Sequence, residues 1–365
     1  MKLIRPAGLA PVMALAVASL ALAGCGDSSG GKSADGRDTV RLAIGSPSWN
    51  AGYATLAVSE ARKYFAKENL DVKVLLFPSG TQVAQQVISG KVDVGLMTPE
   101  PVGIGHTKGT DLTYFAQYWT RWIYGLKVPQ QSAIASAADL EGKRVGVTAV
   151  ASSGTTFART ALKMQGRDPN SAKFIPIGGG AQQLDAIKSG KVDALALWDT
   201  QYQIVENTGV QLKPLPVPGT ESLFGGGFAV KKGDLKDERG LLTRFGRAFA
   251  KGVVFADANP EAAVHDLWKL HPETKTKAQG SETEVLADEV KVLKVRLDGM
   301  NVGPGEGDRY GEMNTASVTG TVKFMNTAGL IDKEFPATEI FTNDLIPEIN
   351  KFSFGEIRAE AKKAS

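Results

Sequence analysis

The chain has 365 residues, of which 42% are hydrophobic and 22% charged. This composition is typical of a folded protein with room for two domains and excludes a wholly disordered chain. The formal net charge of +3 falls to +1 if Lys2 and Arg5 leave with a leader, so we expect no nucleic-acid binding. A single cysteine excludes an intrachain disulfide and a cysteine-cluster metal site, and three histidines offer little for zinc or for a catalytic triad. We therefore expect no cofactor and no metal.

Residues 1–24 have the pattern of an export signal. A positively charged start precedes an apolar stretch, residues 9–23, that ends in small residues. Leu22-Ala23-Gly24-Cys25 looks like a bacterial lipobox, in which Cys25 is lipidated and becomes the first residue; a plain signal peptide with a chance cysteine is the alternative. Residues 25–38 are rich in Gly, Ser, Lys and Asp, which predicts a flexible tether. We expect an exported protein, periplasmic or at the cell surface, with a lipid anchor to a bacterial membrane.

One sequence pattern occurs twice, a hundred residues apart. Ser89-Gly90-Lys91-Val92-Asp93 is repeated as Ser189-Gly190-Lys191-Val192-Asp193, and a Gly-x-Gln triplet precedes each copy at the same spacing. Each copy is typical of a helix that ends at Ser-Gly and leads through a turn into a buried strand. The surrounding elements repeat the order β-α-β-α-β, which predicts two equivalent three-layer α/β lobes. Chance similarity between two alternating βα chains is the alternative.

The pattern of apolar residues predicts the elements in chain order. The first unit is expected to contain strand 40–45, helix 53–65, strand 72–77, helix 81–88 and strand 92–97. The second is expected to contain strand 144–150, helix 155–165, strand 173–177, helix 181–188 and strand 192–198. Segments 112–118, 123–128 and 224–230 are expected to run between the lobes.

The chain from about residue 225 onward is predicted to be mostly helical. The expected features are a helix over 241–256, a helix that starts at Pro260, a helix over 282–297, a Gly-rich loop over 299–311, a helix that stops near Gly329 and a solvated tail over 358–365. Lobe one then comprises residues 39–122 and 225–365, and lobe two comprises residues 123–224.

The architecture predicts where a ligand binds. In open parallel sheets, ligands bind beyond the carboxyl ends of the strands, so the loops after the first and third strands of each lobe should line one cleft. These loops and the crossing segment contain the following candidate ligand-binding residues: Trp49, Asn50, Tyr53, Thr98, Glu100, Trp119, Arg121, Trp122, Ser152, Ser153, Gly154, Thr155, Trp198 and Asp199.

Each candidate also has a purely structural interpretation. The start of a helix at Ser152-Ser153-Gly154-Thr155 suits an anion, because helix N-termini present unpaired N–H groups, but the same residues serve as ordinary N-caps. Glu100 and Asp199, expected on opposite lobes, suit an amino group or serve as first-turn residues of helices. The tryptophans suit stacking on a flat ring or are core residues. Arg121 suits a bidentate anion contact or lies at the surface.

Several segments resemble a known family. Asn50-Ala51-Gly52-Tyr53-Ala54, residues 64–72, the Ser-Gly-Lys-Val-Asp phrase and residues 138–147 resemble solute-binding proteins for nitrate, sulfonates, taurine and thiamine precursors. The resemblance implies a two-lobed type 2 periplasmic-binding fold with two hinge crossings. It also implies a monomer that delivers a solute to the membrane permease and ATPase of an ABC importer.

The resemblance places the Ser152-Ser153-Gly154 turn on the ligand anion, and Asn50, Thr98 and Trp198 in the pocket. Glu100 departs from what a purely anionic ligand requires, so a zwitterion such as taurine, or an amino-bearing aromatic such as a pyrimidine, is expected.

Two other classes of function are alternatives. Some fungal members of the superfamily synthesise a pyrimidine with a cysteine-rich motif, but the only cysteine here is Cys25, so we expect no enzymatic activity. A ligand sensor with the same clamshell is the third class.

Overall fold

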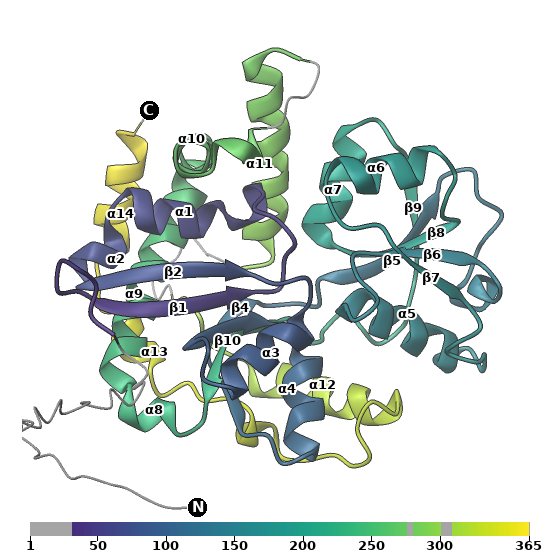
Figure 1. The fold of residues 1–365 in the computed structure, drawn as a ribbon, viewed down its shortest axis with the longest axis horizontal. Coiled ribbons are helices and arrows are strands. Elements are labelled where there is room, and N and C mark those ends of the chain that lie inside the picture. Colours follow the sequence, from purple (N-terminus) through teal and green to yellow (C-terminus); the bar gives the residue numbers. More distant parts are fainter. Residues whose placement is uncertain (1–30, 276–279, 301–308, 365) are drawn as a thin grey trace, which may run out of the picture.

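Two five-stranded mixed sheets form the centres of two lobes, in a computed structural model that describes residues 31–275, 280–300 and 309–364 (Figure 1). The spatial order of the first sheet is β2 (Leu70–Leu76), β1 (Asp38–Ile44), β3 (Val94–Met97), β10 (Gly226–Lys231) and β4 (Leu112–Trp119). That of the second is β7 (Lys173–Pro176), β6 (Arg144–Val147), β8 (Ala194–Trp198), β5 (Tyr124–Pro129) and β9 (Leu212–Leu215). The predicted α/β architecture is confirmed. The predicted leader and Cys25 lie outside the described residues.

The two sheets have the same topology. In each, three parallel strands come from one βαβαβ unit, a fourth strand runs antiparallel to them, and a fifth strand at the edge pairs antiparallel with the fourth. The fourth position is filled by β10 in the first sheet and by β5 in the second, and each of these strands directly follows a crossing between the lobes. Each lobe therefore receives one strand from a crossing segment, which ties the lobes together.

Helices cover the sheets and form most of the C-terminal part of the first lobe (Figure 1). Their bounds are α1 Ala54–Ala61, α2 Tyr64–Lys67, α3 Gly80–Ile88, α4 Pro99–Thr107, α5 Ser153–Met164, α6 Ala181–Lys188, α7 Asp199–Asn207, α8 Asp234–Asp237, α9 Arg239–Ala258, α10 Pro260–Leu270, α11 Glu282–Asp298, α12 Thr315–Thr327, α13 Ile346–Ile349 and α14 Phe354–Lys362. Short 3₁₀ turns are η1 Ala51–Tyr53, η2 Ala137–Leu140, η3 Pro272–Thr274 and η4 Ala337–Glu339. Among the described residues, no helix combines the length and the apolar character needed to cross a membrane.

The duplicated phrase has a structural explanation. The carboxylate of Asp93 accepts hydrogen bonds from the guanidinium and the backbone N–H of Arg41, and Asp193 accepts the same bonds from Arg144. The backbone N–H of each aspartate also donates to the carbonyl of the same arginine. Each aspartate directly precedes the third strand of its unit, and its bonds to the arginine hold the start of that strand against the first strand. This doubly hydrogen-bonded geometry is the strong form of an Arg–carboxylate pair.

Two expectations differ from the structure, and a third lies mostly outside the described residues. The helix predicted over 53–65 is divided into α1 and α2, because Lys63 between them adopts the left-handed conformation with φ 61°. The tail predicted over 358–365 is not a solvated end, since α14 includes its first part and buries Ala361. Most of the Gly-rich loop expected over 299–311 lies outside the described residues.

The two crossings lie against each other. They comprise residues 120–123 and 216–225. A Cβ atom on Gly225 would lie 2.0 Å from the carbonyl oxygen of Arg121, so only glycine allows this approach. Residues 222–224, which the sequence placed in lobe two, are bonded to α12: Phe224 N–H donates to Thr321, and Ser317 donates to the carbonyl of Ser222. The exact limits of the lobes stay a prediction.

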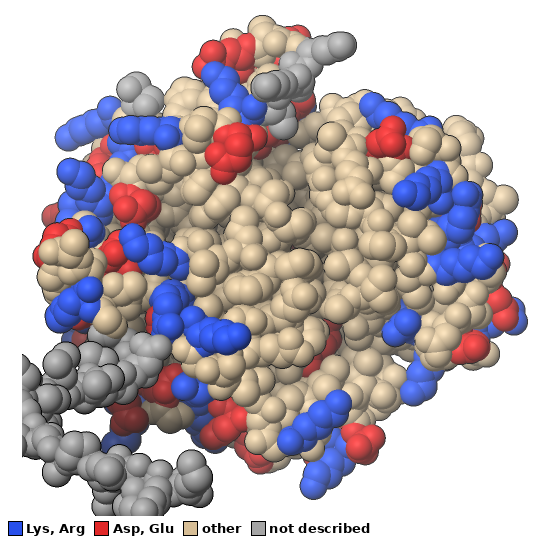
Figure 2. All heavy atoms as spheres, in the orientation of Figure 1, with Lys and Arg blue, Asp and Glu red and all other residues tan. Residues whose placement is uncertain are grey.

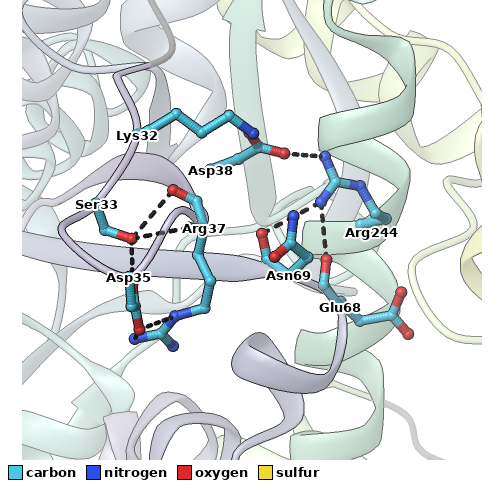
Figure 3. Close-up of polar contacts among 8 residues, drawn as sticks. All are labelled: Lys32, Ser33, Asp35, Arg37, Asp38, Glu68, Asn69 and Arg244. Carbon is cyan, nitrogen blue, oxygen red and sulfur yellow. Dashed lines mark hydrogen bonds and ion pairs between the residues drawn. The ribbon is translucent and has the colours of Figure 1, made fainter.

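The first described residues are held on the first lobe (Figure 3). Asp38, at the start of β1, pairs with Lys32 at 2.6 Å and with Arg244 of α9 at 2.7 Å. Arg37 pairs with Asp35 at 2.7 Å. The described part of the predicted tether therefore makes specific contacts with lobe one.

Replacing the repeated aspartate tests its structural role. We expect Asp93→Ala to lower the free energy of unfolding by about 2 kcal/mol, because it removes the carboxylate that accepts from the guanidinium and the backbone N–H of Arg41. Urea denaturation measures the change. Asp185→Ala removes an exposed carboxylate of α6 and should cost less than about 0.5 kcal/mol. Equal losses in the two variants would show that the Asp93–Arg41 pair does not stabilise the fold.

Candidate functional site

The carboxyl ends of β1, β3 and β8 meet at a narrow space between the lobes. A cavity of about 20 Å³ lies there, with room for roughly one water molecule. It is lined by residues of both lobes and of the crossing: Gly45, Tyr53, Gly80, Leu96, Met97, Thr98, Trp119, Ile123, Tyr124 and Trp198. The lobes therefore touch across the space where the sequence predicts the ligand. Figure 2 shows that the face spanning both lobes carries few charged side chains, which gather around its rim.

Two helix N-termini from opposite lobes meet at this space. Thr98 occupies the N-cap position of α4, but its hydroxyl makes no capping bond. Instead its Oγ1 lies 2.8 Å from Oγ of Ser153, the first residue of α5, and both side chains are buried. The partial positive ends of two helices thus converge on one pair of hydroxyls, which is an arrangement that attracts negative charge.

The neighbouring residues of α5 have structural roles. Ser152 is the N-cap and accepts a hydrogen bond from Thr155 N–H, while Thr155 Oγ1 donates to the carbonyl of Ala149. A Cβ atom on Gly154 would lie 2.2 Å from the carbonyl oxygen of Ala196, so glycine lets the helix start press against β8. Within this turn, Ser153 is the residue whose hydroxyl contacts the other lobe.

Glu100 is a buried carboxyl group next to this contact. It lies in the first turn of α4 with 5% of its surface exposed, and neither carboxylate oxygen has a hydrogen-bond partner. Burial raises the pKa of Glu100 from 4.5 to about 7, although the nearby hydroxyls of Thr98 and Ser153 act in the opposite direction. With Trp122, it lines a second crevice of about 10 Å³ between the lobes. The indole N–H of Trp122 is likewise buried without a partner.

Asp199 joins the lobes through an ion pair. As the first residue of α7 in lobe two, it accepts a hydrogen bond of 2.9 Å from Arg296 of α11 in lobe one. Arg296 is 0% exposed, and it also donates to Thr200 Oγ1 at 3.3 Å. Burial raises the pKa of Asp199, and the adjacent guanidinium opposes that rise. Asp199 is therefore close to the predicted site, but its carboxylate is already paired.

Three of the predicted aromatic residues line the cavity. These are Tyr53, Trp119 and Trp198, and they line it together with Tyr124 at the start of β5. The ring planes of Tyr124 and Trp198 are inclined at 81°, with centroids 6.0 Å apart. The indole N–H of Trp198 donates to Thr200, whereas the buried indole N–H of Trp119 has no partner.

Three predicted residues lie elsewhere. Trp49 stacks on His271 with centroids 4.0 Å apart, outside the residues that line the cavity. Asn50 caps η1 by accepting from Gly52 N–H at 2.9 Å. Arg121 is exposed and donates to the carbonyl of Asp298 at 3.4 Å. Their part in ligand binding stays a prediction.

Sequence reasoning missed Arg296. Arg296 follows Val292 and Leu293 at the spacing that places all three on the buried face of α11, and a charged residue at such a position is a signal that the sequence contained. Tyr124 opens β5, directly after the crossing.

Comparison with known proteins agrees with this geometry. A family model described as NMT1/THI5 like matches residues 50–263, more than half of the chain. The chain belongs to the NMT1/THI5-like family. The predicted resemblance and the periplasmic-binding fold are thereby confirmed.

Individual relatives of this NMT1/THI5-like chain are named for different ligands. A putative aliphatic sulfonates-binding protein of Bacillus subtilis is 26% identical over 282 residues, 74% of this chain and 82% of the relative. The riboflavin-binding protein RibY of Chloroflexus aurantiacus is 21% identical over 303 residues, 82% of this chain and 83% of the relative. The structure of the alkanesulfonate-binding protein SsuA of Xanthomonas axonopodis bound to MOPS is 17% identical, with a TM-score of 0.61 over 83% of this chain and 98% of that chain.

The buried carboxyl group predicts a dependence of stability on pH. Because the folded protein holds the Glu100 proton up to about pH 7, whereas the unfolded chain loses it near 4.5, stability falls as the pH rises through this window. We expect Glu100→Gln to be more stable than the wild type at pH 8, by up to about 3 kcal/mol, and nearly equal at pH 5.

Denaturant unfolding at the two pH values measures this difference. Glu141→Gln, which changes an exposed carboxylate of lobe two, should follow the wild type at both. If Glu100→Gln also followed the wild type at both, Glu100 would not be a buried group with a raised pKa.

Proposed function

We propose that this protein is the extracytoplasmic solute-binding component of an ABC importer. It captures a small organic solute, a sulfonate or a taurine-like zwitterion, between its lobes and delivers it to a permease with its ATPase. The observation that supports this most is the convergence of the α4 and α5 N-termini at the Thr98–Ser153 contact, between the carboxyl ends of two sheets.

An anionic headgroup suits the hydroxyl pair. A sulfonate or carboxylate that entered between Thr98 and Ser153 would replace their mutual hydrogen bond with one bond to each hydroxyl. The N–H groups of the first turn of α5 would add their partial positive charge, whereas the first turn of α4 offers only that of Glu100, because Pro99 and Pro101 have none. Glu100, which neighbours these hydroxyls, is a partner for an amino group of a zwitterion or donates its own proton to an anion. The sulfonate-related names of two relatives support this class of solute.

An aromatic or aminopyrimidine solute is the second candidate. The cavity has four aromatic walls: Tyr53, Trp119, Tyr124 and Trp198. Such side chains stack on flat rings, and one relative is named for binding riboflavin. Glu100 and the indole N–H of Trp122 would then supply an acceptor and a donor for polar atoms on a ring edge.

We propose binding without chemical change of the solute. The side chains that line the cavity are hydroxyl, aromatic and aliphatic groups, and the one cysteine of the chain precedes the described residues. The alternative functions are a pyrimidine-forming enzyme and a ligand sensor of the same fold. An enzyme would convert a bound solute on incubation, whereas a binding protein would return it unchanged.

A ligand screen tests the proposed function. We expect taurine, ethanesulfonate or an aminopyrimidine to raise the melting temperature, and nitrate to have less effect, because a bound solute stabilises the folded state by mass action. Titration calorimetry of the best solute with Ser153→Ala should show a loss of roughly tenfold or more for an anionic headgroup. Ser171→Ala, in the same lobe but remote from the cavity, is the matched control. Absence of binding by every member of the panel would contradict the proposal.

The lipid anchor is a separate part of the proposal. We expect Cys25→Ala to release the full-length protein from the membrane fraction of a bacterium that processes lipoproteins, because the variant lacks the acylated thiol. Ser29→Ala, in the same segment, should stay in the membrane fraction. Fractionation and immunoblotting measure the distribution, and a Cys25→Ala protein that remained on membranes would refute the anchor.

A further inference from the structure

A single guanidinium group contacts residues of both lobes beside the cavity. Arg296 belongs to α11, which packs with the first lobe through α9 and α10 and also against α7 of the second lobe. Its Nη2 donates to Asp199 Oδ1 at 2.9 Å and to Thr200 Oγ1 at 3.3 Å, both on α7. The side chain is completely buried, and these bonds hold only when the lobes are in contact, because both acceptors belong to the second lobe.

The same group connects the two tryptophans that line the cavity. The guanidinium carbon of Arg296 lies 5.2 Å from the centroid of the Trp119 ring, within the range of a cation–π contact. Thr200, which Arg296 contacts on the other lobe, accepts a hydrogen bond of 2.9 Å from the indole N–H of Trp198. Arg296 therefore contacts one aromatic wall at the end of β4 directly, and one in lobe two through Thr200.

Burial of this charge makes the contact sensitive to the position of the lobes. Nε and Nη1 of Arg296 are buried and have no hydrogen-bond partner, so Asp199 supplies most of the compensation for the buried charge. Separation of the lobes removes Asp199 and Thr200 from Arg296 and opens both charges to water. The Arg296–Asp199 pair is thus buried when the lobes are together and solvated when they are apart. Its contribution to the free energy therefore differs between the closed and the open state.

We propose that Arg296 is a positioning residue that couples closure of the lobes to assembly of the aromatic cavity. When the lobes close, Asp199 and Thr200 reach the guanidinium, and Trp119 and Trp198 are brought into their places around the solute. When they open, the link between the two tryptophans is lost. The role in solute affinity rests on the proposed function, but the role in closure does not.

The test compares two double variants. Asp199→Asn with Arg296→Met removes both charges and so leaves neither one buried and unpaired. Arg62→Met with Asp266→Asn removes a comparable pair of 2.6 Å that lies within the first lobe, and it serves as the control. Both are made in the full mature chain with Cys25→Ser, and spin labels are placed at Gln85→Cys on α3 and Asp185→Cys on α6, which are exposed positions of the two lobes.

Double electron–electron resonance measures the distance between the two spin labels, first without any solute. We expect the Arg296 double variant to shift the distribution to longer distances than the wild type, while the control pair leaves it unchanged. Affinity for the best solute of the screen should fall about tenfold in the Arg296 variant alone. A folded Arg296 variant with an unchanged distance distribution overturns the inference. A panel in which no solute binds contradicts the proposed function instead, and the distance measurement still decides the role of Arg296.

Discussion

The site depends on one contact, the hydroxyl pair formed by Thr98 and Ser153 across the two lobes. Each residue opens a helix that follows a strand of its own sheet, so the pair brings together the positive ends of α4 and α5. The duplicated topology makes this possible, because both sheets present the carboxyl ends of their parallel strands to the same space. Without that symmetry, the two helix starts would lie on unrelated surfaces.

Much of the fold was predictable from local patterns. The repeated phrase revealed the two units because Asp93 and Asp193 perform the same task in each, pairing with Arg41 and Arg144. The α6 helix begins and ends where its apolar spacing and Ser-Gly end predict. The break at Lys63 was not predictable in the same way, since no glycine or proline marks that left-handed residue.

The site was predictable in its location but not in its partners. Strand order places Thr98, Ser153 and Trp198 at one edge, and the structure brings these three side chains to the inter-lobe space. Whether an indole faces a cavity depends on residues far away in the chain. The ring of Trp49 stacks on His271, and Asp199 pairs with Arg296 of α11. Such long-range pairs leave no periodic signal in the sequence, although a charge at an inward helical position already marks Arg296.

The buried charged groups explain why the closed arrangement is suited to exchange with an open one. While the lobes are in contact, the carboxylate oxygens of Glu100 and two nitrogen atoms of Arg296 are buried without a hydrogen-bond partner, which is unfavourable. A cavity with room for about one water cannot admit an organic solute unless the lobes first separate. The two crossings, packed at Gly225 and Arg121, are the covalent links about which such a separation has to occur. A solute that supplies partners for the unpartnered groups then favours the closed state by its differential contacts, which is the physical requirement for capture by closure.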